Sequence, residues 1–228
     1  MKILAVIPAR GGSKRLPGKN LRMLSGKPLV VWSIDATMNI PEVCDILVST
    51  DDPAIAAACT AAGALVPWLR PAALATDSAS SVDVALHALD WYEAGKGAVD
   101  GILLLQPTSP FRTTETIRNG IALFGQSGRK AVLGVSSPHA HPLWALKMEN
   151  GHLVPFVREH GLDKRSQDLP AAYAVNGSLY LITPDELRVR RSFLGANTIP
   201  LLVKAQQEAL DIDTPLDFKI AESIAAGM

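Results

Sequence analysis

The sequence predicts an α/β protein with an open, mostly parallel sheet flanked by helices and a small hairpin excursion. Short apolar runs alternate with longer segments that have helical signals, and this alternation favours a parallel sheet. The apolar runs have no consistent polar face, which is typical of strands covered by helices on both sides. Residues 137–175 break the alternation with a Glu-Asn-Gly-His turn between two short apolar stretches. Together these features indicate a Rossmann-like arrangement.

Local signals place the individual elements. Strands are expected at residues 3–7, 45–50, 101–106, 131–136 and 178–183, and helices at 27–40, 53–63, 80–95 and 113–128. Hydroxyl side chains suited to capping helix starts are Ser80, Ser81 and Thr113. Glycines suited to ending helices are Gly63, Gly95 and Gly128. We expect residues 1–228 to form a single domain, with residues 137–165 as an excursion that serves as a lid or a dimer contact.

Composition limits the classes of partner. The 228 residues are 48% hydrophobic, enough for one substantial core, and 22 Lys and Arg balance 22 Asp and Glu. This balance gives no electrostatic reason to expect nucleic acid or an anionic membrane surface as a partner. Cys44 and Cys59 lack the spacing of a disulfide scaffold, and the apolar run 3–7 is too short for a signal peptide or a membrane span. We therefore expect a cytoplasmic protein.

The loop after the first expected strand, ARGGSKRLPGKN at residues 9–20, is suited to holding an anion. It lies at the carboxyl edge of the sheet, where open α/β folds bind ligands. Gly11 and Gly12 permit positive φ, so backbone amides can turn inward as an anion nest. The cations that can bind phosphate oxygens are Arg10, Lys14, Arg15 and Lys19. Because the spacing matches neither the Walker A loop nor the dinucleotide fingerprint, we expect a polyphosphate held in another way.

The turn LQPTSPFR, residues 105–112, is expected at the same edge of the sheet. Gln106 can pair with a base or a sugar hydroxyl, and Thr108 and Ser109 are short hydrogen-bond donors. The two prolines stiffen the turn, which lowers the ordering cost of binding. The turn can also serve to start the next helix, so a structural role and a binding role are both open.

Paired carboxylates occur in DIDTPLDF, residues 211–218. Asp211 and Asp213 are two residues apart, so an extended backbone turns both side chains to the same side. Such a pair can hold Mg²⁺ together with substrate phosphate oxygens. The alternative is a helix start in which Asp213 or Thr214 is the N-cap and Pro215 lies in the first turn.

Six motifs in a fixed order resemble one enzyme family. They are IPARGGSKRLPGKN (7–20), STDD (49–52), RPAALATDSASS (70–81), LQPTSPFR, RSQDLPAAYAVNGSLY (165–180) and DIDTPLDF. They resemble the cytidylyltransferases that activate nonulosonic acids, the CMP-sialic acid synthetase (acylneuraminate cytidylyltransferase) family. The resemblance implies a homodimeric enzyme that uses CTP and Mg²⁺ to convert a nonulosonic acid into its CMP-sugar, with release of pyrophosphate.

The resemblance also implies roles for individual residues. The catalytic contacts to the triphosphate are Arg10, Lys14 and Lys19. The nucleotide-binding residues are Ala9, Gly11, Gly12, Ser13, Asn20, Arg70 and Gln106. The sugar-binding residues are Thr108, Ser109, Arg165, Gln167, Tyr173 and Asn176, and the metal ligands are Asp211 and Asp213. As planar forks, Arg70 and Arg165 can each meet a sugar carboxylate.

Two departures from the family's pattern bear on the acceptor. Ser166 precedes Gln167 where family members often have arginine, and Trp144 follows His-Pro-Leu where some sialic acid synthetases have lysine. N-acetylneuraminic acid and legionaminic acid are therefore both open as acceptors. The rival functions are a transferase for Kdo or for a sugar phosphate, and a noncatalytic nucleotide-binding module. Either Asp211 or a metal-bound hydroxide can deprotonate the attacking hydroxyl.

Overall fold

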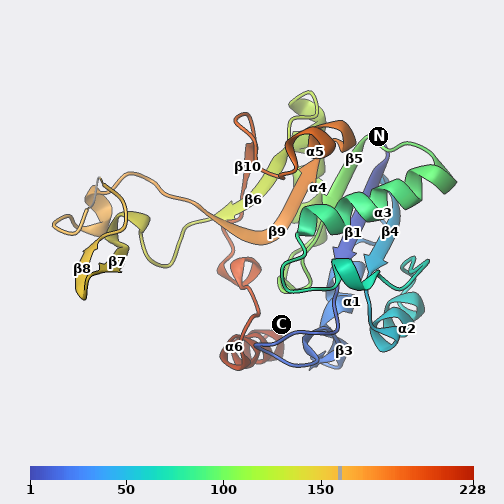
Figure 1. Cartoon of the computed structure of the whole chain (residues 1–228), viewed down its shortest axis with the longest axis horizontal. Helices are drawn as coiled ribbons and strands as arrows, with labels where there is room; N and C mark the ends of the chain where they lie inside the picture. The colour runs from blue at the N-terminus through green and yellow to red at the C-terminus, as the bar shows by residue number, and fades with distance from the viewer. Residues whose placement is uncertain (159–160) are drawn as a thin grey trace.

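The computed structural model describes residues 1–158 and 161–228, and its centre is a six-stranded sheet in the order β10-β6-β9-β5-β1-β4 (Figure 1). The strands of this sheet are β1 (Ile3–Pro8), β4 (Val43–Ser49), β5 (Gly101–Leu104), β6 (Val132–Ser136), β9 (Ala174–Ile182) and β10 (Ile199–Leu202). All run parallel except β9, which is antiparallel to β5 and β6. The predicted open, mostly parallel sheet is confirmed.

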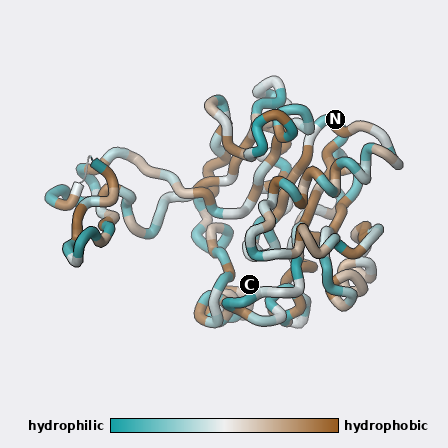
Figure 2. The backbone as a smooth tube through the Cα atoms, in the orientation of Figure 1, coloured by the Kyte–Doolittle hydropathy of each residue, from teal (hydrophilic) through white to brown (hydrophobic). Residues whose placement is uncertain are grey.

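Helices cover both faces of the sheet. They are α1 (Leu29–Thr37), α2 (Pro53–Ala61), α3 (Ser81–Lys96), α4 (Thr114–Gln126) and α5 (Pro184–Arg190). The last helix, α6 (Pro215–Ala226), instead packs through Phe218 and Ala221 in a separate cluster with Leu16, Leu24 and Leu29. Along β1, Ile3, Ala5 and Ile7 pack with α1, α2 and α4, whereas Leu4 and Val6 pack with α3 and α5. This alternation follows from the two-residue period of a strand and explains why β1 has no polar face (Figure 2). Among the described residues, no helix is long and apolar enough to cross a membrane.

The helix boundaries test the capping predictions. Ser80 accepts the Asp83 amide at 3.0 Å, and Thr113 accepts the Thr116 amide at 3.1 Å, so both are N-caps as expected. Ser81 is instead the first residue of α3. The prediction that Gly95 ends this helix is wrong, because α3 continues to Lys96 and Gly97, with a positive φ of 89°, is the C-cap. Gly63 and Gly128 follow α2 and α4 with φ of 88° and 71°, as expected.

The expected hairpin is present and projects from the body. Strands β7 (Leu146–Glu149) and β8 (His152–Pro155) pair antiparallel around Asn150 and Gly151, whose φ angles of 51° and 81° fit a type I′ turn. We call residues 137–173 the arm; it leaves the sheet after β6 and returns at β9 (Figure 1). Two further strands, β2 (Met23–Leu24) and β3 (Lys27–Pro28), form a small separate sheet. The short 3₁₀ helices are η1 (Lys19–Leu21), η2 (Ala72–Leu74), η3 (Pro142–Trp144), η4 (Ser166–Asp168) and η5 (Gln206–Ala209).

Candidate functional site

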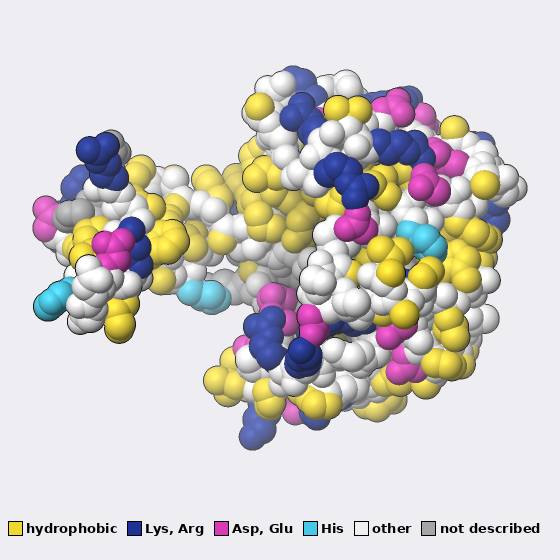
Figure 3. All heavy atoms as spheres, in the orientation of Figure 1, with side chains coloured by type: hydrophobic (Ala, Val, Ile, Leu, Met, Phe, Trp, Pro, Cys, Tyr) yellow, Lys and Arg dark blue, Asp and Glu magenta, His cyan; other side chains and the backbone are white. Residues whose placement is uncertain are grey.

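Two adjoining cavities lie at the carboxyl edge of the sheet. The first, of about 630 Å³, we call the basic cleft, and its polar lining includes Arg10, Ser13, Lys14, Arg15, Lys19, Asn20, Arg70, Asp77, Gln106, Thr108, Asp211 and Asp213. The second, of about 850 Å³, we call the side cavity, and its lining includes Gln106, Val135, Tyr173, Asn176, Tyr180, Lys204 and Asp211. Gln106 and Asp211 line both cavities and mark their junction. Figure 3 shows a hollow below the base of the arm with acidic and basic side chains at its edge.

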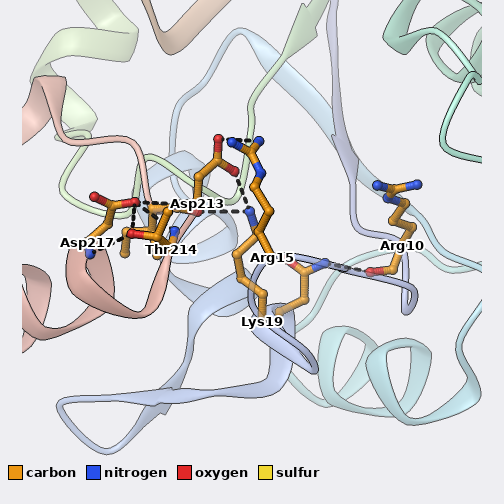
Figure 4. Close-up of polar contacts among 8 residues, drawn as sticks. Arg10, Arg15, Lys19, Asp213, Thr214 and Asp217 are labelled. Carbon is orange, nitrogen blue, oxygen red and sulfur yellow. Dashed lines mark hydrogen bonds and ion pairs between the residues drawn. The ribbon is translucent and has the colours of Figure 1, made fainter.

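The amino-terminal loop and the paired aspartates meet in the basic cleft. Lys19 Nζ donates to the Ile212 carbonyl at 2.8 Å and lies 3.0 Å from Asp213 Oδ1 (Figure 4). Arg15 donates to the other oxygen, Asp213 Oδ2, at 2.7 Å. The Lys19 side chain is only 11% exposed, so its ion pair is shielded from water more than an ordinary surface pair. Segments almost 200 residues apart in sequence thus form one wall of the cleft.

In the motif DIDTPLDF, Thr214 is the residue that caps the helix, and Asp211 and Asp213 both line the cleft. Thr214 is the N-cap of α6, and it forms a capping box in which Asp217 Oδ2 accepts the Thr214 amide at 2.7 Å. Asp213 is therefore not the cap, and its carboxylate faces Lys19 and Arg15 instead (Figure 4). The helix-start role and the metal-binding role of this motif are compatible, because Thr214 caps the helix while Asp211 and Asp213 stay available for a cation.

Asp211 lies at the junction of the two cavities in an electrostatically unfavourable place. Desolvation by the surrounding walls raises its pKa, and the nearby charge of Asp213 raises it further. A hydrogen bond from the Thr108 hydroxyl and the charge of Lys19 act in the opposite direction without cancelling the increase. A carboxylate whose charged form is disfavoured in a cleft is a candidate for binding a cation.

Arg10 and Lys14 pair with a residue that sequence analysis did not assign to the site. Arg10 lies 2.7 Å from Asp77 Oδ1, and Lys14 pairs with Asp77 Oδ2. Hydrogen bonds from Lys14 and then from Arg10 hold the pKa of Asp77 below its usual range. Its only signal in the sequence is its place within the motif RPAALATDSASS. An anionic group therefore already contacts two of the cations expected to bind phosphate.

The glycines of the loop act differently from the prediction. Gly11 and Gly12 do not have positive φ; the left-handed residue of this loop is Gly18, with φ 65°. The Gly11 amide donates to Asp51 Oδ1 at 2.9 Å, and a Cβ atom at Gly11 would lie 2.8 Å from Asp52 Oδ2. Gly11 is thus suited to close packing against the start of α2, rather than to an anion nest.

Some residues predicted to bind the nucleotide lie behind the cleft surface. Ala9 is buried and donates its amide to the Ser49 carbonyl, so Ala9, Gly11 and Gly12 are not part of the lining. Ser13 does line the cleft. Asn20 is buried with its amide nitrogen 2.9 Å from the Arg10 carbonyl, while its Oδ1 atom has no partner among the described residues. A buried acceptor of this kind is suited to a ligand's hydrogen-bond donor.

Arg70 forms part of the cleft wall, but most of its guanidinium is already bound. Its Nε donates to Ser49 Oγ at 2.9 Å, and its other nitrogens donate to the Ser49 and Leu74 carbonyls. Burial is the main cause that lowers its pKa, to about 10. The prediction that Arg70 presents a planar fork to a carboxylate is therefore not supported by its contacts.

A buried arginine, not identified from the sequence, joins the LQPTSPFR turn to β9 near the cavity junction. Arg112 donates to the Gln106 carbonyl at 2.8 Å and also to the Ser178 and Gly177 carbonyls, while a further nitrogen donates to Ser33 Oγ at 3.0 Å. Burial is the main cause that lowers its pKa, to about 9. Arg112 thereby fixes the LQPTSPFR turn, which it ends, against β9 and α1.

The start of β9 supplies the polar wall of the side cavity. Asn176 Oδ1 accepts from the Ser178 amide at 3.1 Å and its hydroxyl at 2.7 Å, whereas Asn176 Nδ2 is buried without a partner among the described residues. Ser109 is buried behind this wall, with its hydroxyl 3.3 Å from the Asn176 carbonyl. Gly177 has φ 73°, and a Cβ atom there would lie 2.9 Å from Gln106 Oε1. Asn176 is thus held rigidly, with a donor left for a ligand.

The arm does not bring all of its predicted residues to this site. Arg165 pairs with Asp168 at 2.8 Å, and neither Arg165 nor Gln167 lines the basic cleft or the side cavity. The reason is geometric, because η4 is carried by the arm, which extends away from the sheet (Figure 1). Tyr173, where the arm returns to β9, does line the side cavity. Within this chain, Arg165 and Gln167 are therefore outside the site.

Comparison with known proteins agrees with this arrangement. A family model described as Cytidylyltransferase matches residues 4–224. CMP-N,N'-diacetyllegionaminic acid synthase of Legionella pneumophila is 41% identical over 225 residues, covering 98% of this chain and 96% of that protein. N-acylneuraminate cytidylyltransferase of Streptococcus agalactiae serotype V is 34% identical over 223 residues; the match covers 96% of this chain but only 52% of that longer protein.

The fold also matches a solved structure of a nucleotide complex. CMP:2-keto-3-deoxy-manno-octonic acid synthetase complexed with CTP aligns with a TM-score of 0.74 over 100% of this chain and 99% of that one. At 18% sequence identity, this likeness shows the shared fold alone. The family model and the curated relatives show the family as well as the fold, because their sequences match nearly the whole chain. The chain belongs to the cytidylyltransferase family, in the acylneuraminate group that its motifs resemble.

Proposed function

We propose that this enzyme transfers CMP from CTP to a nonulosonic acid and releases pyrophosphate. The contact of the cationic loop with the aspartate pair, through Lys19 and Asp213, carries the proposal. It joins groups that neutralise phosphate to groups that can hold a divalent cation, and phosphoryl transfer depends mainly on such positioning and charge neutralisation. The named relatives, one a synthase of a CMP-activated nonulosonic acid and the other a cytidylyltransferase for N-acylneuraminate, support the same reaction.

Different residues of the basic cleft are proposed to bind the triphosphate and the cytidine of CTP. Arg10, Lys14 and Lys19 are proposed to bind the triphosphate, since cations near the β- and γ-phosphates stabilise the charge that develops on the leaving pyrophosphate. Asn20 Oδ1, a buried acceptor, and Gln106 are proposed to hold the cytidine. Binding of the triphosphate requires Arg10 and Lys14 to exchange Asp77 for phosphate oxygens.

Asp211 and Asp213 are proposed to hold Mg²⁺. Two carboxylates together with phosphate oxygens and water form the donor set that this hard cation prefers, so a third acidic ligand is not needed. The raised pKa of Asp211 fits this role, and no lysine or arginine of the described part of the chain forms an ion pair with its carboxylate. When bound, the cation neutralises phosphate charge and orients the α-phosphate for attack.

The side cavity is proposed to hold the acceptor. It opens to the basic cleft at Gln106 and Asp211, so an acceptor there can present its anomeric hydroxyl to the α-phosphate. The unpartnered Asn176 Nδ2 can donate to an acyl carbonyl or a hydroxyl, and Tyr173 adds an aromatic wall. Asp211, at the junction, is the carboxylate best placed to accept the proton of the attacking hydroxyl.

A pyrophosphate-release assay tests the reaction. Pure protein with Mg²⁺ and CTP is expected to turn over N,N'-diacetyllegionaminic acid faster than N-acetylneuraminic acid or Kdo, because a legionaminic acid synthase is 41% identical to it. The rate of pyrophosphate release is expected to be higher with CTP than with ATP, GTP or UTP. Turnover of Kdo alone would identify the acceptor as the eight-carbon acid. CTP binding by folded protein without turnover of any acid would favour the noncatalytic module and contradict the proposal.

We also propose that two chains associate through the arm. Met148 and Leu153 lie opposite each other on the hairpin and are 74% and 67% exposed, so a single chain leaves an apolar face uncovered. A second copy is a fitting partner because the arm extends far enough to reach beyond its own body (Figure 1). Such a contact would also give Arg165 and Gln167 access to a neighbouring site.

Light scattering tests this assembly. The wild type is expected to have the mass of two chains, and Met148→Glu combined with Leu153→Glu is expected to give single chains, because buried unpaired carboxylates oppose the contact. Lys147→Gln, on the other face of the hairpin, is the matched control and should stay dimeric. A wild-type protein with the mass of one chain would contradict the proposal.

A cytoplasmic location is part of the same proposal. Cys44 and Cys59 are both free thiols. Free thiols are usual in proteins of reducing compartments, where disulfides are rare. Fractionation of cells that produce the protein should recover it with cytoplasmic markers.

A further inference from the structure

The side cavity has one positively charged side chain for an acidic acceptor. Among the described residues that line it, Lys204 is the only lysine or arginine, whereas the basic cleft has five. A nonulosonic acid carries a carboxylate on the same carbon as its reacting hydroxyl. A carboxylate brought into a cavity that also contains Asp211 requires a compensating cation.

The backbone holds Lys204 on the cavity side of the sheet edge. The pattern after β10 alternates, with Leu201 8% exposed and Leu202 47% exposed, and then Val203 buried and Lys204 exposed. The Val203 amide donates to the Val135 carbonyl at 2.8 Å, which continues the pairing with β6 beyond Leu202. Lys204 therefore has the orientation of Leu202, and both line the cavity together with Val203 between them.

Among the residues that the structure describes, no acidic group is paired with the charge of Lys204, although the same cavity includes Asp211. Arg165 is one of the two arginines that the sequence suggested for the carboxylate, the other being Arg70, and it differs from Lys204 both in its pairing and in its place. It is paired with Asp168 and lies outside the cavity.

We infer that Lys204 binds the carboxylate of the acceptor acid and thereby restricts the enzyme to α-keto-acid sugars. This inference rests on the proposed function and adds a specificity residue to it. A lysine provides a compact charge with three donors, so it can bind a carboxylate without the planar geometry of arginine. Lys204 would also offset the repulsion between the acceptor carboxylate and Asp211.

Steady-state kinetics with Lys204→Met, of similar length and no charge, test the inference. The acceptor KM is expected to rise about 10-fold or more, as for loss of a hydrogen bond to a charged group, with the CTP KM changed less than about twofold. Lys204→Arg should recover most of the acceptor affinity. Raised salt should weaken acceptor binding by the wild type more than by Lys204→Met. The control is Lys219→Met, an exposed lysine of α6 that lines neither cavity.

The outcomes separate this inference from the proposed function. Absence of turnover by the wild type with every acid would overturn the function itself. Turnover by the wild type with an unchanged acceptor KM in Lys204→Met would overturn only the inference. If Arg165→Met raised the acceptor KM while Lys204→Met did not, the carboxylate would be held by the arm. Equal rises in the acceptor and CTP KM values would indicate a general structural role, again against the inference.

Discussion

Asp211→Asn is expected to reduce turnover by about 100-fold or more while leaving the protein folded, because it removes a charge that acts directly at the reacting phosphate. Asparagine keeps the shape of the side chain and can still accept the Thr108 hydroxyl. The effect should appear in kcat for pyrophosphate release at saturating CTP and Mg²⁺. Asp185→Asn, an exposed residue of α5 that lines neither cavity, should leave turnover unchanged.

The same substitution is expected to raise the melting temperature at neutral pH without metal. The folded state raises the pKa of Asp211, so ionising it costs stability as pH rises from the ordinary aspartate pKa through the raised one. The asparagine side chain of the variant does not ionise, and the gain should therefore vanish in acid. Asp213→Asn should also lose turnover but should lower the melting temperature, because it removes the ion partner of Lys19 and Arg15. Full activity of both variants would contradict the metal assignment.

Arg112→Met is expected to cost about 3 kcal/mol of unfolding free energy, because it leaves buried carbonyls without their charged donor. The three carbonyls belong to Gln106, in the LQPTSPFR turn, and to Gly177 and Ser178, in β9. Loosening the turn from β9 should also raise the KM for the acceptor, whose cavity both segments border. Urea unfolding followed by circular dichroism measures the stability, and the release assay measures the KM.

Arg118→Met provides the comparison for this prediction. Arg118 is an exposed arginine of α4 with one hydrogen bond, to the Asn39 carbonyl at 3.3 Å. Its replacement should change stability by no more than about 0.5 kcal/mol. If Arg112→Met and Arg118→Met were equally stable, the hydrogen bonds of Arg112 would not be holding the LQPTSPFR turn against β9.

The sequence predicted those parts of the fold that depend on short-range interactions. Ser80 and Thr113 cap helices because a hydroxyl reaches an amide three residues ahead, and Asn150 with Gly151 forms a tight turn through backbone angles alone. Strand β10 was not predicted, because it contains Pro200, which removes a backbone donor. The proline is tolerated because β10 is an edge strand, with β6 as its only partner in the described sheet.

Site residues could be predicted where a motif directly follows a strand. They were harder to predict where residues far apart in the sequence meet in the fold. Arg10, Lys19 and Asp211 line the basic cleft as expected. Asp77 contacts Arg10 across 67 residues, a separation over which no local pattern acts. Arg165 lies one position before the place where the family often has arginine, and it belongs to the arm, so its position is set by the arm's path away from the sheet (Figure 1).

A crystal structure with CTP and Mn²⁺ tests the central claim most directly, because Mn²⁺ takes the same oxygen ligands as Mg²⁺ and is visible by anomalous scattering. We expect the ion about 2.2 Å from an Asp211 oxygen and from a phosphate oxygen, with Lys14 and Lys19 at the triphosphate. The ion pair between Lys14 and Asp77 should be broken in that complex. A triphosphate bound away from residues 10–20, or an ion that contacts neither Asp211 nor Asp213, would contradict the claim.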